Sequence, residues 1–219
     1  MPRLTPERRE ARRAEILAAA RRCFSRDGFH QTSMPDIADE AGLSAGAAYR
    51  YFSSKEDIII EIAGQAFAAM FAPLDAQLVA GGAPPTVADL VAAAIGPVSG
   101  EITRDAAGQP VPVDELLRCA VQAWAELLRH EELRQRAVAG IERVRDQIAA
   151  ALRRGQQAGT VPANLDPKRG TRVILALLHG FVLQRTAFGL DDAEGFTEDV
   201  RTVLTDPVLG GERRARSKR

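Results

Sequence analysis

Cysteine is scarce in this 219-residue chain, and its two cysteines carry no recognisable chemistry. Cys23 and Cys119 lie far apart, each in an apolar helical pattern, and neither belongs to a CxxC pair or a Cys/His cluster. This spacing argues against a disulfide framework and a zinc site, so we expect two buried free thiols. The three histidines, His30, His130 and His179, are scattered. Without a nucleophile, metal-ligand spacing or a glycine-rich phosphate loop, the sequence does not indicate an enzyme, and we expect neither a cofactor nor a metal.

Long hydrophobic runs are also missing. The longest, Val173–Leu183, is interrupted by His179, and it is far shorter than the ~20 residues that a membrane span requires. The N-terminus is rich in Arg and Glu, which is unlike the apolar core of a signal peptide. We therefore expect a cytoplasmic protein without a membrane partner.

Net charge is absent as well, because 29 Lys and Arg balance 29 Asp and Glu, but the charges are unevenly placed. Residues 1–55 contain ten basic and seven acidic residues, residues 56–211 contain fourteen and twenty-one, and residues 212–219 contain five and one. A basic N-terminal region beside an acidic body favours an anionic partner for that region.

Strand-type alternation is absent over any useful length, whereas helical periodicity is widespread. Ser33 with Asp36 has the spacing of a capping box, and Thr86 is another predicted N-cap. Pro73 should kink or split the helix that contains it, and residues 104–112, with their glycine and prolines, are predicted to be a loop. The fold class is therefore all-α with about nine helices, predicted at 7–27, 33–41, 44–52, 55–79, 86–96, 113–129, 131–158, 167–188 and 192–205.

Two short helices joined by Ala41-Gly42-Leu43-Ser44 have the outline of a helix-turn-helix, whose second helix enters the major groove of DNA. That segment carries the only two tyrosines of the chain, on either side of Arg50. If the apolar side chains face inward, Tyr49 and Arg50 face outward, where a hydroxyl can donate to phosphate and a guanidinium can read guanine. A purely structural packing module is the alternative, but it does not explain exposed Tyr49 and Arg50 beside Lys55. The expected DNA contacts are Ser33, Ser44, Ala45, Gly46, Ala47, Tyr49, Arg50, Tyr51 and Lys55.

Over roughly residues 10–70 the sequence resembles the TetR family of one-component transcriptional regulators. The resemblance implies a homodimer with an N-terminal helix-turn-helix DNA-binding domain and a C-terminal helical domain that binds a small ligand and dimerises. We assign these to residues 10–70, with the helix-turn-helix at about 33–52, and to residues 71–207, followed by a basic tail at 208–219 that we expect to be disordered rather than bound to DNA. The matching residues are Ile16-Leu17-Ala18-Ala19-Ala20, Phe24, Gly28, Thr32-Ser33, Asp36-Ile37-Ala38, Ala41-Gly42-Leu43-Ser44, Gly46, Tyr49, Tyr51-Phe52 and Ser54-Lys55-Glu56.

The resemblance further implies that an effector enters among the fourth to eighth helices and tilts the DNA-binding domains apart. The pocket should be mostly apolar, and its candidate residues, each of which can also be plain core, are Phe67, Met70, Phe71, Cys119, Trp124, Leu128 and His179. His179 itself can be a satisfied core histidine, a dimer-interface group or a polar handle for the ligand. The predicted dimer interface consists of apolar side chains on the last two helices, namely Leu175, Leu178, Phe181, Val182, Phe188, Phe196, Val200 and Val203.

The function expected from this resemblance is that of a repressor released from a palindromic double-stranded DNA operator by a small, apolar effector. An effector-independent DNA binder or activator is the alternative. Ala45 and Ala47 stand where the family often has hydrogen-bonding side chains, so Arg50 is the main candidate for reading a base, and the alanine methyls can touch thymine. DNA shape should then carry more of the selectivity than usual. The basic arm either contacts flanking phosphates or is a frayed, solvated terminus; its residues are Arg3, Arg8, Arg9, Arg12 and Arg13.

Overall fold

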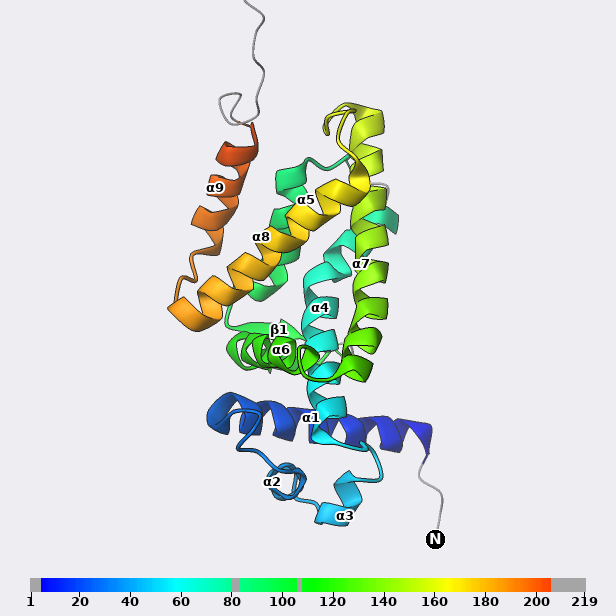
Figure 1. Cartoon of the computed structure of the whole chain (residues 1–219), viewed down its shortest axis with the longest axis vertical. Coiled ribbons are helices and arrows are strands. Elements are labelled where there is room, and N and C mark those ends of the chain that lie inside the picture. Colours follow the sequence, from blue (N-terminus) through cyan, green and yellow to red (C-terminus); the bar gives the residue numbers. More distant parts are fainter. Residues whose placement is uncertain (1–4, 80–82, 106–107, 206–219) are drawn as a thin grey trace, which may run out of the picture.

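The computed structural model of the chain describes residues 5–79, 83–105 and 108–205. These ranges form an α-helical protein, as predicted, with one short β-hairpin. Helices α1 to α3 make one end of the molecule, and α4 leads from this end into the rest (Figure 1). The elements are α1 (Pro6–Asp27), α2 (Met34–Glu40), α3 (Ala45–Ala48), α4 (Lys55–Val79), α5 (Val87–Ile95), the 3-10 turn η1 (Gly96–Val98), β1 (Ile102–Arg104), β2 (Pro110–Pro112), α6 (Val113–Leu127), α7 (Glu131–Ala158), α8 (Pro167–Phe188) and α9 (Ala193–Thr205).

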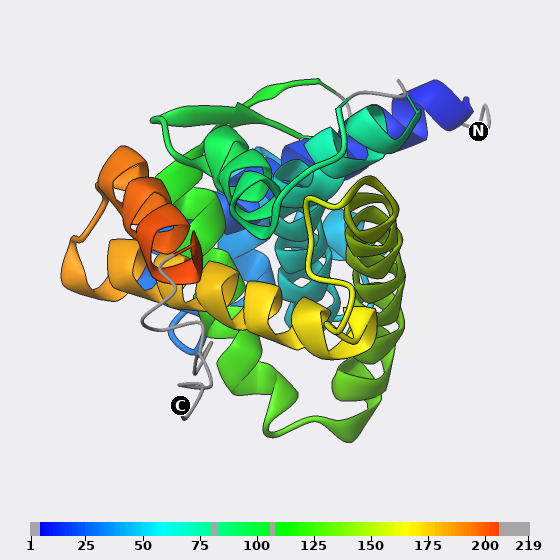
Figure 2. The ribbon, with the colours of Figure 1, turned by 90° about the horizontal axis from the view of Figure 1, so that it is seen from above.

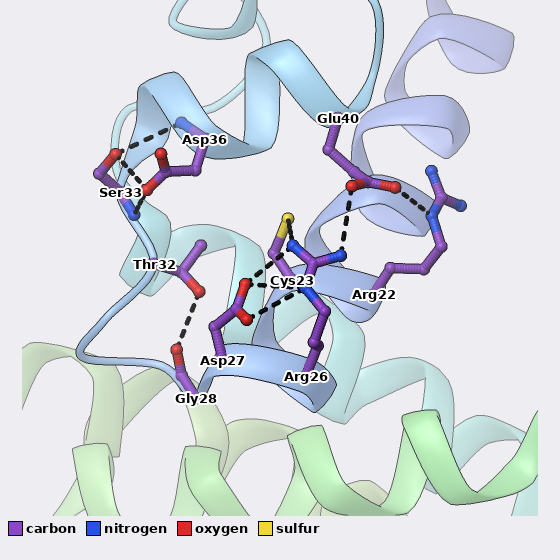
Figure 3. A network of polar contacts seen from close by, with 9 residues as sticks. All are labelled: Arg22, Cys23, Arg26, Asp27, Gly28, Thr32, Ser33, Asp36 and Glu40. Atoms are coloured by element: carbon purple, nitrogen blue, oxygen red, sulfur yellow. Dashed lines mark hydrogen bonds and ion pairs between the residues drawn. The ribbon is translucent and has the colours of Figure 1, made fainter.

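Local signals in the sequence explain the N-terminal helices. Gly28 ends α1 with a φ of +86°, a conformation that disfavours residues with a Cβ. The predicted capping box opens α2, because the amide of Asp36 donates to Ser33 Oγ and the amide of Ser33 donates to the Asp36 carboxylate (Figure 3). Gly42, with a φ of +67°, makes the turn between α2 and α3. The three helices enclose a buried core that includes Ile16, Phe24, Ile37 and Phe52.

Helix α4 belongs to two hydrophobic cores. Near its start, Ile58 and Ile62 are buried with α1 to α3, and further along Met70 and Phe71 are buried with the C-terminal helices. The helix runs through Pro73 without interruption, so it is not split there, and a kink at Pro73, the other predicted outcome, stays a prediction. The domain boundary that we predicted between residues 70 and 71 thus falls within one continuous helix.

A β-hairpin occupies the segment that we predicted to be a loop. Strands β1 and β2 pair antiparallel, with Thr103 opposite Val111. Pro110 and Pro112 fit because hydrogen-bonded and non-bonded pairs alternate along such a ladder, so these two positions need no inward N–H. Strands of three residues are also too short to show an alternating pattern in the sequence. Val111 is buried in the N-terminal core, and β2 packs against α6.

Helices α6 to α9 complete the C-terminal part. Helix α6 lies across α1, while α7 and α8 pack against each other and α9 packs against α5 (Figures 1 and 2). Arg185 of α8 donates to the backbone carbonyls of Val98, Ser99 and Gly100, which fastens α8 to the end of η1. Within the described ranges, no helix is both long enough and apolar enough to cross a membrane. The predicted tail at 208–219 lies outside these ranges.

Candidate nucleic-acid interface and internal cavity

The second helix of the helix-turn-helix is very short, since α3 comprises only Ala45–Ala48. Ala48 and Phe52 are buried in the N-terminal core, and Tyr49 is 53% exposed with Arg50 exposed beside it. Ser44 and Gly46 are exposed as well. Tyr49 and Arg50 therefore lie on the outer face, as the pattern predicted; their contact with DNA stays a prediction.

Two of the predicted contact residues lie in packed positions instead. Ala47 is only 9% exposed, so little of its methyl group is available to a thymine, and its contact with DNA stays a prediction. Tyr51 is half-buried and packs against the N-terminal core. Its backbone carbonyl accepts a hydrogen bond from Arg13 Nη1 at 2.9 Å. Because α3 has only four residues, both Ala47 and Ala48 are needed to pack it against the N-terminal core.

Lys55 and Ser33 also have partners within the chain. Lys55 Nζ donates to the carbonyls of Phe29 at 2.9 Å and Thr32 at 3.1 Å, and it lies 4.4 Å from the centre of the Phe29 ring. Because an ammonium has three donors, one remains for a phosphate. The hydroxyl and the backbone amide of Ser33 both donate to the carboxylate of Asp36, and these two hydrogen bonds lower the pKa of Asp36 (Figure 3). Ser33 and Lys55 thus stabilise the loop that precedes α2 and the start of that helix.

Most arginines of the N-terminal helices are paired with carboxylates. Arg22 and Arg26 of α1 both reach Glu40 of α2, which fastens these helices together (Figure 3). Arg12 pairs with Glu15, and Arg13 reaches Glu61 of α4 while its guanidinium lies 4.4 Å from the centre of the Phe52 ring. Arg13 is therefore held within the protein and is not part of a frayed, solvated terminus, while a contact of the arm with DNA stays a prediction. Over residues 5–55, the basic side chains without a hydrogen bond or ion pair are Arg8, Arg9 and Arg50.

An aromatic cluster lies between α4, α6 and α8. The predicted pocket residues Phe67, Met70, Phe71, Trp124 and His179 line it. The space at its centre amounts to about 10 Å³ for a water-sized sphere, which is roughly enough for one water molecule. A ligand therefore has to displace side chains in order to enter. The further lining residues, which the sequence did not single out as pocket, are Ala66, Leu117, Ala120, Leu175, Leu178 and Val182.

His179 is the polar group of this cluster. Its ring meets those of Trp124 and Phe67 edge-on, with centroid separations of 5.0 and 5.9 Å. Burial lowers the pKa of His179, so the imidazole is neutral near pH 7. Its Nε2 atom is buried and has no hydrogen-bond partner. Such an atom carries a cost in free energy unless a ligand or a water molecule satisfies it.

Two predicted pocket residues lie elsewhere. Leu128 directly follows the last residue of α6 and is 89% exposed. Cys119 is buried on the opposite side of α6, in the N-terminal core, where burial raises the pKa of its thiol to about 12. Cys119 and Cys23 are both free and buried, as expected. The helical pattern predicted that Cys119 is buried. It could not tell whether Cys119 faces the N-terminal core or the aromatic cluster, because α6 packs against both.

The predicted dimer-interface residues fall into a buried group and an exposed group. Five of them are buried within a single chain and cannot supply interface area, namely Leu175, Leu178, Phe181, Val182 and Val200. Phe196 is partly buried against Phe181, with the ring centroids 5.2 Å apart. Phe188 and Val203 are exposed, as an interface requires, and other large apolar side chains are exposed with them on or between α8 and α9, namely Val173, Leu183, Leu190 and Leu204. An interface on α8 and α9 stays a prediction, but five of its eight predicted residues lie on the inner faces of these helices.

The remaining titratable groups form no metal centre. In the part of the chain that the structure describes, no three His, Cys, Asp or Glu side chains are grouped as metal ligands. His30 and His130 instead flank the buried carboxylate of Glu126, with Nε2 to oxygen separations of 3.3 and 3.5 Å.

Comparison with known proteins gives two family matches. The model of the tetR family of bacterial regulatory proteins matches residues 16–62, which contain the helix-turn-helix. The model of the C-terminal region of BetI-type transcriptional repressors matches residues 105–206, which extend from the hairpin to just beyond α9.

Individual relatives agree with these matches. An uncharacterised HTH-type transcriptional regulator of Bacillus subtilis, YfiR, is 46% identical over 61 residues, but the match spans only 28% of this chain and 30% of YfiR. The HTH-type transcriptional regulator UidR of Escherichia coli is 26% identical over 196 residues, which are 88% of this chain and 90% of UidR. The fold is similar to that of the fatty acid degradation regulator FadR of Bacillus halodurans, with a TM-score of 0.71 at 20% identity over 97% of this chain and 99% of FadR. The helix-turn-helix, the all-helical body and both family matches together establish that this chain belongs to the TetR family of DNA-binding transcriptional regulators.

Proposed function

We propose that this protein is a homodimeric repressor that leaves a palindromic DNA operator when a small, mostly apolar effector enters between α4, α6 and α8. The observation that carries the proposal is the continuity of α4. Its first residue, Lys55, borders the helix-turn-helix, and Phe67, Met70 and Phe71 further along line the aromatic cluster. Because one helix belongs to both sites, a movement of α4 caused by an effector would also move the DNA-binding end.

The exposed residues of the helix-turn-helix support DNA binding. Arg50 is unpaired and can read guanine or grip phosphate, and the hydroxyl of Tyr49 can donate to phosphate. Arg8 and Arg9 of α1 are also exposed and unpaired, which suits them to flanking phosphates. With few side chains able to read bases, we infer that DNA shape contributes strongly to selectivity.

The chemistry of the aromatic cluster supports an uncharged effector. None of its lining residues in the described part of the chain is charged, and the unpartnered Nε2 of a neutral His179 offers one hydrogen bond between aromatic rings. A ligand with a flat apolar body and one hydroxyl or carbonyl group would suit this environment. Solved proteins with this fold are complexes with lauroyl-CoA, with triclosan and with choline, which supports a small effector but not a particular one.

The exposed apolar surface of α8 and α9 supports a homodimer. Beside it, a groove is bounded by the start of α5, the α7–α8 connection, α8 and α9, and Val173 and Leu204 are among its exposed apolar lining residues. A second copy related by a two-fold axis would bury this surface in a four-helix bundle. Two-fold symmetry would also match a palindrome whose half-sites are spaced by whole helical turns, at about 34–36 Å each.

The DNA and effector parts can be tested together. DNA that binds the full-length protein is selected from a random duplex library, and its affinity is measured by fluorescence anisotropy at several salt concentrations. We expect a palindromic consensus. Uncharged aromatic compounds are then screened by thermal shift, and a hit at 100 times its Kd should stabilise the protein by about 2.7 kcal/mol and release the selected duplex. Failure to select any sequence would refute the regulator proposal, and hits that stabilise without releasing DNA would refute effector-controlled repression.

The dimer part has its own test. Phe188→Glu should shift the protein towards monomer in sedimentation velocity, because it introduces a charge into the apolar surface. Leu128→Glu is the matched control, since Leu128 is also a large, exposed apolar residue but does not belong to α8 or α9. Equal dimer fractions for both variants would show that the interface lies elsewhere.

A further inference from the structure

The loop between α1 and α2, residues 28–32, forms hydrogen bonds with the N-terminal part of the chain and with helix α6 of the C-terminal part. Within that end, the Thr32 hydroxyl donates to the Gly28 carbonyl (Figure 3). Lys55, at the start of α4, donates to the carbonyls of Phe29 and Thr32. Because residue 33 caps α2, any displacement of this loop displaces the start of the helix-turn-helix.

From the C-terminal part, α6 holds the same loop through Gln122. Its Oε1 accepts from the backbone amide of Phe29 at 2.7 Å, and its Nε2 donates to the carbonyl of Phe24 at 3.0 Å. The oxygen and the nitrogen of this one side-chain amide thus both form hydrogen bonds with the backbone near the end of α1. Since the bonds go to main-chain atoms, they fix the path of the chain rather than the position of one side chain.

Glu126 makes a second attachment one helical turn further along α6. Its side chain is only 3% exposed, and its carboxylate lies between His30 of the loop, at 3.3 Å, and His130 just before α7, at 3.5 Å. A buried carboxylate is costly unless neighbouring groups compensate it. Movement of the loop away from α6 would remove His30 from this carboxylate.

The same helix forms a wall of the aromatic cluster. Leu117, Ala120 and Trp124 of α6 line that cluster, while Gln122, between Ala120 and Trp124, and Glu126, two residues after Trp124, face the loop. The cluster has room for about one water molecule as it stands. A ligand that opens it has to push against α6, α4 or α8, and a displacement of α6 pulls directly on the loop.

We propose that Gln122 and Glu126 are positioning residues that couple the aromatic cluster to the DNA-binding end by fixing the 28–32 loop to α6. This inference rests on the proposed function. In the effector-free arrangement the two side chains hold the loop, and with it α2, in one orientation relative to the body. Opening of the cluster shifts α6 and releases that orientation. Because coupling between two sites is reciprocal, DNA bound to the helix-turn-helix must in turn stabilise the closed cluster.

This reciprocity allows a test without a known effector. Hydrogen exchange of the full-length protein is measured by mass spectrometry with and without a duplex selected from a random library. In the wild type, the duplex should slow exchange in peptides of α6 and α8 that line the cluster by about tenfold, within the usual range of coupling factors. In the double variant Gln122→Ala/Glu126→Gln, the duplex should slow those peptides by less than about twofold, because the coupling is lost. Duplex affinity should stay within about fivefold of wild type, since neither residue lies on the DNA-facing surface.

The control is the double variant Gln157→Ala/Glu132→Gln, which changes the same residue types at exposed positions of α7. It should behave as the wild type. If the first double variant does not fold, Gln122→Ala and Glu126→Gln are measured singly, and each should reduce the DNA-induced slowing. Full slowing in these variants, or no slowing in a wild type that binds DNA, would overturn the coupling proposal and leave the regulator proposal standing. A wild type that selects no DNA would refute the proposed function itself.

Discussion

Arg13 is the residue for which a DNA contact and a structural role predict opposite results. We consider Arg13→Met, which keeps an apolar stem and removes the guanidinium. The variant loses the hydrogen bond to the Tyr51 carbonyl at 2.9 Å, worth about 1.5–3 kcal/mol for a charged donor. It also loses the contact with the Phe52 ring at 4.4 Å, worth about 0.5–1 kcal/mol. The ion pair with Glu61 adds little, about 0–1 kcal/mol, because both side chains are partly exposed.

These contributions are not additive, because they belong to one group, so we expect the free energy of unfolding to fall by about 2–3 kcal/mol. The same loss should loosen the turn that carries Tyr49 and Arg50. DNA affinity should then fall on all sequences, while its salt dependence stays unchanged, because no phosphate contact is removed. Arg12→Met is the matched control. Arg12 is the neighbouring residue and pairs only with the exposed Glu15, so its effect on stability should stay within about 0.5 kcal/mol.

Urea unfolding at one fixed protein concentration measures the first quantity, and anisotropy with a selected duplex at several salt concentrations measures the second. If Arg13→Met leaves stability unchanged and lowers the slope of log affinity against log salt by about one, Arg13 contacts a phosphate. That result would refute the structural role assigned to Arg13.

Three further predictions concern separate parts of the molecule. Arg50→Ala should cost about 1–3 kcal/mol on the preferred duplex and less on others, as a lost bidentate contact to guanine would; uniform weakening in competition binding, which we expect for Tyr49→Phe, would instead make Arg50 a phosphate contact. Because burial lowers the pKa of His179, the unfolded chain takes up its proton first as the pH falls below about 6.5. The free energy of unfolding should therefore fall more steeply below that pH in the wild type than in His179→Leu, and parallel pH profiles would contradict this. Arg185→Met should lower stability by roughly 1–3 kcal/mol, because three consecutive carbonyls at the end of η1 lose their donor, whereas the exposed Arg153→Met on α7 should leave the urea midpoint unchanged.

Local chemistry made much of the fold predictable. Ser33 and Asp36 fix the start of α2 through contacts three residues apart, and Gly42 fixes its turn through its own φ angle. Such signals act within a few residues, so a single sequence contains them. The exposed position of Tyr49 and Arg50 followed in the same way, from the apolar residues on the opposite side of the segment.

What the sequence could not provide depends on partners far along the chain. Arg12 and Arg13 are adjacent and chemically identical, yet only Arg13 meets residues 51 and 61. Lys55 looks like a free cation until the loop at 29–32 is folded beside it. Leu175 and Leu178 belong to an apolar helix with two faces, and only the positions of α4 and α6 decide that these two side chains line the cluster rather than a partner subunit.

The closely packed state of the aromatic cluster has a consequence for kinetics. A site with room for about one water molecule must open before the proposed effector can bind, and the apparent affinity is then multiplied by the fraction of time that the site is open. The observed association rate should consequently level off as the concentration of the ligand rises, at the rate of the opening itself. A cell that relied on this switch would respond to sustained exposure and ignore brief pulses.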